Sequence, residues 1–565
     1  MKSHPWIYKL AILALVVILL VIGTLGCSNA PVASPTPERV NPLNQVPEPV
    51  NTIARQVMAS LSEQNFEVRS GYFKLYTKDD CDYSYEVMET CYGNNPAAPY
   101  VLPALPVWPD EAKNPATKNA FGPTMEGYDV SYRLDPREAI LIMGVLPPPA
   151  AYFGSQTYLS NRRQASWNTS DPRYQQIVAK YPPSLVNALF NYVPQDHARI
   201  QLAASLSNAI NNVVITQQSG AVWDQVRYII ITPDPYMDRT IRENLLKSAV
   251  APADIFTEPI PDGMVTGLDM DADEFLTLIR YSMPNPENKA AAETWQQQLP
   301  LVLLRIRDTT PDRPAEKFPA FTEPEARVSA VPSERLLGNS VKNLLLAVMK
   351  QWGAACAQPD CSDRIEPFQN WQTPIISLVG PRCQEIGMNC LGDTQDTIYQ
   401  ISSAMPLDNH EVYAVAGPLG TITGNATYVG LGLNSSLKKK GFDNLSQSDL
   451  EGTASAYASS VVTSTEQLYL YYFARNCAGL EALTGGNCRS ISEIDVPVCS
   501  NPADSPCDGL SFSLRDYILP GTRRGPDAAG TLPPVLLKLS RPTGLTDLRT
   551  VYLAFGWNSH RFSFR

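Results

Sequence analysis

Two aspartates stand where the order of predicted elements would place a ligand or catalytic site. Asp234 follows the apolar run Gln225 to Thr232, which predicts a strand, and Asp238 opens a predicted helix that ends near Ala249. Ligands in open α/β sheets bind beyond the carboxyl ends of strands, so Asp234 and Asp238 are the best positional candidates. A Pro-Asp-Pro turn followed by a helix N-terminus accounts for the same two residues and is the simpler interpretation.

Histidine is the most frequent general base in enzymes, but this chain contains only four. Three of them lie beyond the N-terminal apolar segment, namely His197, His410 and His560. His197 opens the segment 197–210, whose apolar spacing predicts a helix, and His410 precedes a predicted strand. A helix start and a turn are the plain interpretations of these two positions, and the G-x-S-x-G nucleophile motif is absent. Catalysis by His197, His410 or Asp234 therefore stays an alternative to a binding function.

An acidic run resembles the start of a calcium loop without completing it. Asp269, Asp271 and Asp273 have the DxDxD spacing of an EF-hand. The next position is Glu274 where that loop needs glycine, and the twelfth is Arg280 where it needs a bidentate glutamate. Acidic residues at the start of a helix, predicted over 272–283, explain the run equally well. We expect no metal site here.

Nucleotide and nucleic-acid binding are disfavoured by motif and by charge. The sequence GPLGTITGNATY contains three glycines, namely Gly417, Gly420 and Gly424. It has neither the lysine of a Walker motif nor the G-x-G-x-x-G spacing of a dinucleotide-binding motif. The net charge of −11 argues against nucleic acid as a partner. We therefore expect no cofactor and no nucleic-acid partner.

The cysteines indicate an oxidising compartment. The chain contains 11, and ten of them fall into close couples: Cys81 with Cys91, Cys356 with Cys361, Cys383 with Cys390, Cys477 with Cys488, and Cys499 with Cys507. An even set of close couples is typical of local disulfides in exported proteins. A zinc site is disfavoured because the spacings are not CxxC and histidines are absent nearby.

The remaining cysteine, Cys27, follows an export signal. Lys2 and Lys9 precede the apolar stretch Leu10 to Gly26, as in a secretory signal. Thr24-Leu25-Gly26-Cys27 resembles the cleavage box of bacterial lipoproteins, which implies lipid attachment at Cys27, although that family usually has Leu and then Ala or Ser in the first two places. An uncleaved anchor or an ordinary secretory signal are the alternatives. Lipidation, an uncleaved anchor and a secretory signal all place the rest of the chain outside the cytoplasm. Lipidation and an uncleaved anchor would also hold it at a membrane.

The 565 residues divide into an anchor and several folded segments. We expect a signal or anchor at 1–27, a proline-rich spacer at 28–50, a β-rich or α+β segment at 51–160, an α/β segment at 161–308, a connector at 309–333 and a disulfide-containing α+β segment at 334–565. Within the middle segment, a strand at 225–232, a helix at 238–249 and a strand at 254–259 predict a βαβ unit. The expected fold class is mixed α+β and α/β, with several domains and a β-rich C-terminal segment.

Further strands are predicted from short apolar runs, at 139–145, 301–307, 375–379, 412–416, 426–433, 467–473, 535–539 and 551–555. Helices are predicted at 51–64, at 288–298 and from residue 334, where an amphipathic pattern reaches Trp352. The first segment is rich in aromatic residues: Tyr72, Phe73, Tyr76, Tyr83, Tyr85, Tyr92, Tyr100 and Trp108. These residues either pack in a core or bind a protein or glycan ligand.

Three short stretches of the C-terminal segment resemble parts of secreted bacterial proteins without assigned function. They are NCLGDTQDT at 389–397, TGNATY at 423–428 and LYLYYFARNC at 468–477. The sequence as a whole predicts a membrane-anchored extracytoplasmic protein with a binding or interaction role, and an extracytoplasmic hydrolase is the alternative. The oligomeric state is left open.

Overall fold

The computed structural model describes residues 46–92, 94–181, 183–321, 327–328, 332–355, 364–367, 369–370, 380–498 and 508–542. The predicted signal, Cys27 and His560 lie outside these ranges, as do the predicted strands at 375–379 and 551–555. Among the described residues, no helix has the length and apolar character needed to cross a membrane. The described strands form five sheets with helices packed on them, so the fold class is mixed α+β as expected.

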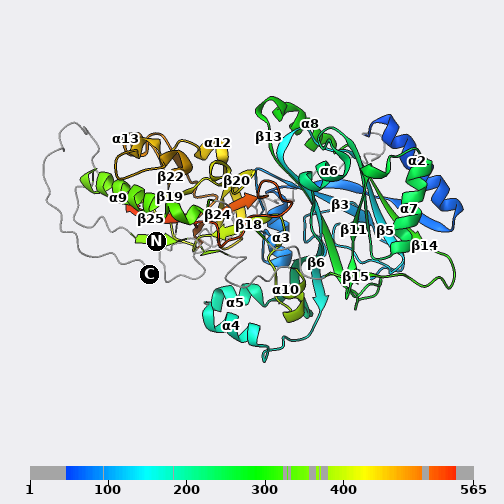
Figure 1. Ribbon diagram of the computed structural model, residues 1–565. Coiled ribbons are helices and arrows are strands. Elements are labelled where there is room, and N and C mark those ends of the chain that lie inside the picture. The colour runs from blue at the N-terminus through cyan, green and yellow to red at the C-terminus, as the bar shows by residue number, and fades with distance from the viewer. Residues whose placement is uncertain are drawn as a thin grey trace, which may run out of the picture. The chain divides into compact units, whose positions relative to one another are not determined.

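The first sheet has five strands and contains the predicted βαβ unit (Figure 1). Its strands, in spatial order, are β1 (Phe66–Ser70), β14 (Leu301–Asp308), β5 (Glu138–Val145), β10 (Val226–Thr232) and β11 (Ile255–Pro259). Strands β10 and β11 are parallel and are joined by helix α7 (Pro235–Lys247), which confirms the βαβ prediction. Helix α2 (Glu48–Glu63) lies beside α7 and buries Val57 and Leu61 on one face.

The second sheet has eight strands and packs against the first. Its main path is β2 (Tyr72–Tyr76), β3 (Tyr100–Pro106), β13 (Glu274–Pro284), β6 (Ala150–Arg163), β8 (Asp196–Ser205) and β7 (Tyr192–Val193), with β4 (Tyr128–Asp129) and β9 (Ile210–Asn211) at its edges. A small sheet pairs β12 (Pro261–Asp262) with β15 (Phe318–Ala320). Both large sheets take strands from 51–160 and from 161–308, so these two ranges share one core.

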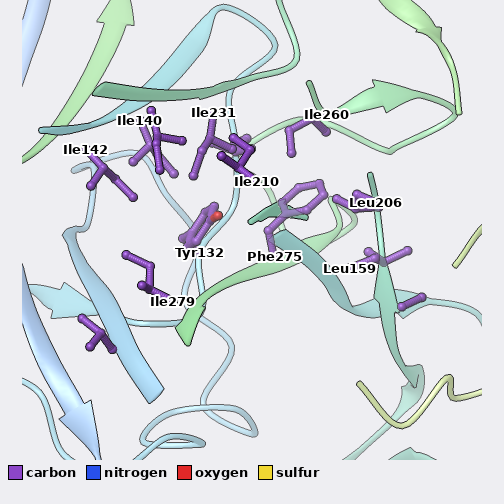
Figure 2. Packing of buried hydrophobic residues seen from close by; sticks show 14 of the residues in the cluster. Tyr132, Ile140, Ile142, Leu159, Leu206, Ile210, Ile231, Ile260, Phe275 and Ile279 are labelled. Atoms are coloured by element: carbon purple, nitrogen blue, oxygen red, sulfur yellow. The ribbon is translucent and has the colours of Figure 1, made fainter. Parts of the chain in front are cut away.

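Isoleucine, leucine and aromatic side chains make up most of that core. Figure 2 shows Tyr132 and Phe275 among Ile140, Ile142 and Ile231, and all five are buried. Because β5 and β10 are buried along nearly their whole length, their sequences are continuous apolar runs instead of alternating ones.

Two predicted helices are wrong. Residues 197–210 and 272–283 largely form strands β8 and β13. In β8 the core-facing side chains have a period of two, namely Ile200, Leu202 and Ala204. Strand β13 is buried on both faces, so its apolar residues imitate helical spacing.

The C-terminal segment contains two further five-stranded sheets that enclose a second core. The first consists of β16 (Arg364–Pro367), β25 (Val535–Ser540), β19 (Glu411–Pro418), β22 (Leu468–Ala474) and β23 (Cys488–Ser490). The second consists of β17 (Gln369–Asn370), β18 (Thr397–Ile401), β24 (Leu510–Tyr517), β20 (Tyr428–Ser435) and β21 (Lys440–Ser446). Helix α9 (Gly338–Ala355) covers the outer face of the first of these sheets, and Tyr469 and Phe512 lie in the core between the two.

The remaining helices are short or lie at the edges of the sheets. They are α3 (Asp80–Met88), α4 (Pro172–Lys180), α5 (Pro183–Leu189), α6 (Asn212–Ser219), α8 (Lys289–Gln298), α10 (Pro381–Ile386), α11 (Gly420–Thr423), α12 (Gln447–Leu450) and α13 (Glu481–Thr484). Single 3₁₀ turns lie at η2 (Pro252–Asp254), η3 (Pro286–Asn288), η4 (Glu334–Leu337), η5 (Ser455–Tyr457) and η6 (Thr465–Gln467). Helix α8 and strand β14 confirm the predictions at 288–298 and 301–307.

Three of the five predicted cysteine couples form disulfides in the described residues: Cys81–Cys91, Cys383–Cys390 and Cys477–Cys488. Disulfides persist in oxidising compartments, so these three bonds indicate an environment outside the cytoplasm.

The other two couples lie outside the described residues. They are Cys356 with Cys361, and Cys499 with Cys507. Both of these disulfides, Cys356–Cys361 and Cys499–Cys507, therefore stay predictions from spacing alone.

Candidate functional site

Asp234 is a buried structural clamp at the start of α7. Its Oδ1 accepts hydrogen bonds from the backbone N–H of Tyr236 at 2.9 Å and of Glu316 at 3.2 Å. Its Oδ2 forms an ion pair with Arg313 at 2.7 Å, and Arg313 also pairs with Asp308. Both carboxylate oxygens of Asp234 therefore already have partners, in the first turn of α7 and in the connector 309–333.

Asp238 lies one helical turn from Asp234, and its backbone N–H donates to the Asp234 backbone oxygen at 3.2 Å. Asp238 accepts a hydrogen bond from Thr257 of β11 and makes an ion pair with Arg242 on its own helix. His197 is exposed, and His410 is exposed in a turn where its backbone N–H donates to Asp408. Among the described residues, no hydrogen bond joins either histidine to Asp234 or Asp238.

The acidic run at 269–273 forms a turn held by its own contacts. Asp269 accepts the backbone N–H groups of Asp271 and Ala272 at 2.7 and 3.2 Å. Asp271 pairs with Arg163, and buried Asp273 pairs with Arg162 at 2.6 Å. Of the described residues, no three His, Cys, Asp or Glu side chains are grouped to hold a metal ion.

A polar centre that the sequence analysis missed lies where the eight-stranded sheet meets the β18–β24–β20 face of the C-terminal segment. We call it the tyrosine junction. It consists of Arg280 with five tyrosines, namely Tyr152 and Tyr158 of β6, Tyr399 of β18, Tyr428 of β20 and Tyr517 of β24. Each of these strands presents the residue on the face turned away from its own apolar core, which brings them together.

Arg280 is the charged group of the junction, and it is only 5% exposed. Its Nη2 donates to the Tyr158 hydroxyl at 2.9 Å, while its Nε is buried without an acceptor. The guanidinium also lies over the rings of Tyr100 and Tyr158, at 5.4 and 5.5 Å from the ring centroids. Among the described residues, no carboxylate forms an ion pair with it. A buried charge normally has a counter-ion, so this arginine is unusual.

The tyrosines pack on one another and stay neutral. The ring of Tyr517 lies 4.4 Å from that of Tyr152 and 5.2 Å from that of Tyr428, and its hydroxyl lies 3.3 Å from that of Tyr399. Burial raises the pKa values of Tyr152, Tyr158 and Tyr517 well above the ordinary tyrosine value. The hydroxyls of these three tyrosines therefore act as neutral donors and acceptors near the Arg280 guanidinium.

The phrase NCLGDTQDT supplies the acidic side of the junction. Tyr152 donates to Asp396 Oδ2 at 2.8 Å, and Asn211 donates to the same oxygen at 3.1 Å. Thr394 donates to Asp396 Oδ1 at 2.7 Å, and the buried Arg327 guanidinium, which donates to the backbone oxygens of Thr394 and Thr397, interacts electrostatically with this carboxylate. Asp393 accepts from Ser205 and from the backbone N–H of Gly380, which holds the same loop against β8. The loop thus joins the two halves of the described structure.

Two glycines make room for the tyrosine rings. Gly154 pairs with Arg280 across β6 and β13, and a Cβ at Gly154 would lie 2.3 Å from the Tyr152 hydroxyl. A Cβ at Gly430 of β20 would lie 2.8 Å from the Tyr428 hydroxyl. Glycine inside a strand often marks such a close approach.

Gly154→Ala is expected to lower the free energy of unfolding by about 1–3 kcal/mol, because the added methyl displaces Tyr152 from its Asp396 hydrogen bond. Chemical denaturation measures the change. Gly338→Ala is the matched control, since a Cβ at Gly338 meets nothing within 4 Å. Equal stability of Gly154→Ala and the wild type would contradict the packing described here.

Sequence reasoning missed this site because its members come from five strands that lie far apart in the chain. The only signals were the phrase at 389–397 and the aromatic richness of the first segment. Of that aromatic set, Tyr76 and Trp108 are buried in the structure and Tyr83 is 41% exposed.

No protein-family model matches the chain, and no curated protein matches it. Among solved structures, the crystal structure of an uncharacterized protein from Burkholderia cenocepacia is similar to it, with 9% sequence identity and a TM-score of 0.32. The likeness covers 87% of this chain and 95% of that chain. A likeness of this degree assigns neither a family nor an activity.

Proposed function

We propose that the protein is an exported, membrane-tethered binding protein that holds an oxyanion-bearing ligand at the tyrosine junction. Arg280 is the observation that carries this proposal. It is a permanently charged guanidinium, nearly fully buried, with one neutral hydrogen-bond acceptor among the described residues. A bound carboxylate would supply the missing acceptors and the counter-charge.

The ligand class that fits best is a saccharide carrying a carboxylate. Arginine matches the two oxygens of a carboxylate with its planar fork of donors. Neutral tyrosine hydroxyls both donate and accept hydrogen bonds, as sugar hydroxyls do. Arg515 lies on the same face of β24 as Tyr517 and adds a second positive charge to this region.

The hydrolase alternative lacks a converging group of catalytic residues in the described structure. His197 and His410 are both exposed, and Asp234 is occupied by Arg313 and by the cap of α7. A general base has to lie within hydrogen-bond reach of its nucleophile, and neither histidine hydrogen bonds a nucleophilic side chain among the described residues. The geometry therefore favours binding.

The main test replaces Arg280 by glutamine and by lysine in the full chain in detergent, with binding followed by titration calorimetry. Glucuronate is expected to bind the wild type, to bind Arg280→Gln at least tenfold more weakly, and to bind Arg280→Lys with intermediate affinity, because a charge-assisted hydrogen bond contributes about 1.5–3 kcal/mol. Glucose and inorganic phosphate are the comparison ligands, which separate recognition of the sugar from recognition of any anion.

Arg239→Gln is the matched control, because it removes one arginine charge from an exposed pair with Glu316. It is expected to bind glucuronate as the wild type does. Wild-type affinity in Arg280→Gln, or no binding of glucuronate by the wild type, would refute the proposed site.

Export is supported by the three disulfides, and membrane tethering is supported by the lipoprotein-like sequence at Cys27. Cys27→Ser is expected to lose the lipid-sized mass of the wild type and to leave the membrane fraction, because the thiol is the attachment point. Intact-mass spectrometry and membrane fractionation measure both effects. A wild type without added mass would exclude lipidation and leave an uncleaved anchor or an ordinary secretory signal.

A further inference from the structure

A second group of buried polar side chains lies between the two C-terminal sheets and plays no part in the tyrosine junction. Asp516 follows Phe512 and Leu514 on the inner face of β24, and both of these residues belong to the core between the sheets. Tyr469 faces the same core from β22. Asp516 and Tyr469 therefore approach one another from opposite sheets.

The carboxylates of this group have no basic partner among the described residues. Asp516 is 4% exposed, and its Oδ1 accepts no hydrogen bond there. Glu334, 5% exposed, accepts hydrogen bonds only from neutral donors, namely the Thr423 hydroxyl at 2.6 Å and the Leu532 backbone N–H at 3.1 Å. Neither residue forms an ion pair within the described part of the chain. Two buried acids without a cation are costly to ionise.

Three neutral groups of β22 and of the segment 420–425 also lack hydrogen-bond partners among the described residues. The Tyr469 hydroxyl, the Asn425 amide oxygen and the Thr421 hydroxyl are all buried without a hydrogen-bond partner in the described structure. Tyr469 and Asn425 are completely buried. Buried polar groups nearly always have partners, so several orphans in one place need an explanation.

The segment 417–425 contains three glycines and runs beside the polar groups of this second cluster. Gly420 accepts the backbone N–H of Asn425 at 2.8 Å, and a Cβ at Gly420 would lie 3.0 Å from Asp516 Oδ1. A Cβ at Gly417 would lie 3.2 Å from the Tyr469 hydroxyl. The Thr423 hydroxyl lies 2.6 Å from Glu334 Oε1 and 3.3 Å from the Gly420 backbone oxygen, so Glu334 adjoins the same turn of the loop as Asp516 does.

We infer that Asp516, Glu334, Asn425 and Tyr469 form a binding site for Ca²⁺. The donor set consists of two carboxylates and neutral oxygens, with no sulfur or imidazole, which is the chemistry that hard divalent cations prefer. Calcium tolerates irregular geometry better than magnesium does, and a site made from an irregular loop suits the larger ion. The cation would neutralise both acids and partner the orphan oxygens.

The test measures calcium binding to the chelator-treated full chain in detergent. Calcium is expected to raise the melting temperature of the wild type over roughly 0.1–10 mM, the range typical of extracellular calcium modules. Magnesium should raise it less at equal concentration. Asp516→Asn should bind calcium at least tenfold more weakly and should melt no lower than the wild type in chelator, since it removes an uncompensated buried charge.

Asp271→Asn is the matched control, because it removes an exposed carboxylate from the other acidic run of the chain. Terbium luminescence sensitised by tyrosine gives a second readout, which Tyr469→Phe should diminish even if Asp516→Asn fails to fold. Calcium stabilisation that is absent from the wild type, that persists in Asp516→Asn or that disappears in Asp271→Asn would overturn the assignment.

Discussion

Arg305→Met is expected to lower the free energy of unfolding by about 3–5 kcal/mol, because it leaves two buried carboxylates without their counter-charge. Arg305 and Glu138 are both fully buried and form an ion pair, and Glu111 pairs with the same guanidinium at 2.6 Å. The guanidinium also donates to the backbone oxygens of Pro106 and Arg133. Denaturant unfolding followed by tryptophan fluorescence measures the change.

Arg307→Met is the matched control two residues away on the same strand. Arg307 pairs with exposed Asp110 and half-exposed Glu67 and lies over the ring of Trp108, so its loss should change stability by about 1 kcal/mol, well below the effect at Arg305. If Arg305→Met were no more destabilising than Arg307→Met, the buried pair would not stabilise the fold in the way described.

Glu258→Gln is expected to become increasingly stable relative to the wild type as the pH rises from about 4.5 to 7. Glu258 is fully buried on β11, and burial raises the pKa of its carboxyl from 4.5 to about 7. Below pH 4.5 the carboxyl is protonated in both the folded and the unfolded protein, so it adds no pH dependence. Between pH 4.5 and 7 the carboxyl ionises only in the unfolded state. The free energy of unfolding of the wild type therefore falls by about 3 kcal/mol over this range, and it falls no further above pH 7.

Denaturant unfolding at several pH values between 4 and 8 measures this difference. Glu243→Gln, at an exposed position of α7, shows what the removal of a surface glutamate does under the same conditions. The other buried acids of the wild type, such as Glu138, are unchanged in the variant, so they cancel from the comparison. A stability difference that does not vary with pH would show that Glu258 is ionised in the folded protein.

The sequence predicts elements well where local signals agree. The β10–α7–β11 unit was predicted because a strong apolar run, a Pro-Asp-Pro turn and an amphipathic helix follow one another. Strand β13 was mistaken for a helix because burial on both of its faces removes the alternation that marks a strand, whereas in β8 the period of two at Ile200, Leu202 and Ala204 was overlooked. The three local disulfides of the described structure were also predictable, since parity and spacing suffice for couples that close short loops.

The site was not predictable from the sequence for a different reason. Arg280 appeared only as the residue that breaks a calcium-loop pattern, and its tyrosine neighbours come from strands on two different sheets. Which face each strand presents depends on register, and register is fixed by packing between sheets rather than by local spacing. Asp396 lay within a phrase noted for its likeness to secreted proteins, but nothing in that phrase shows that it faces Tyr152.

The most direct test of the binding proposal is a crystal structure of the protein with glucuronate. The proposal predicts a ligand carboxylate within hydrogen-bond distance of the Arg280 guanidinium, with tyrosine hydroxyls of the junction bonded to the sugar. A well-occupied glucuronate held elsewhere on the protein, with Arg280 still bonded only to Tyr158, would contradict it.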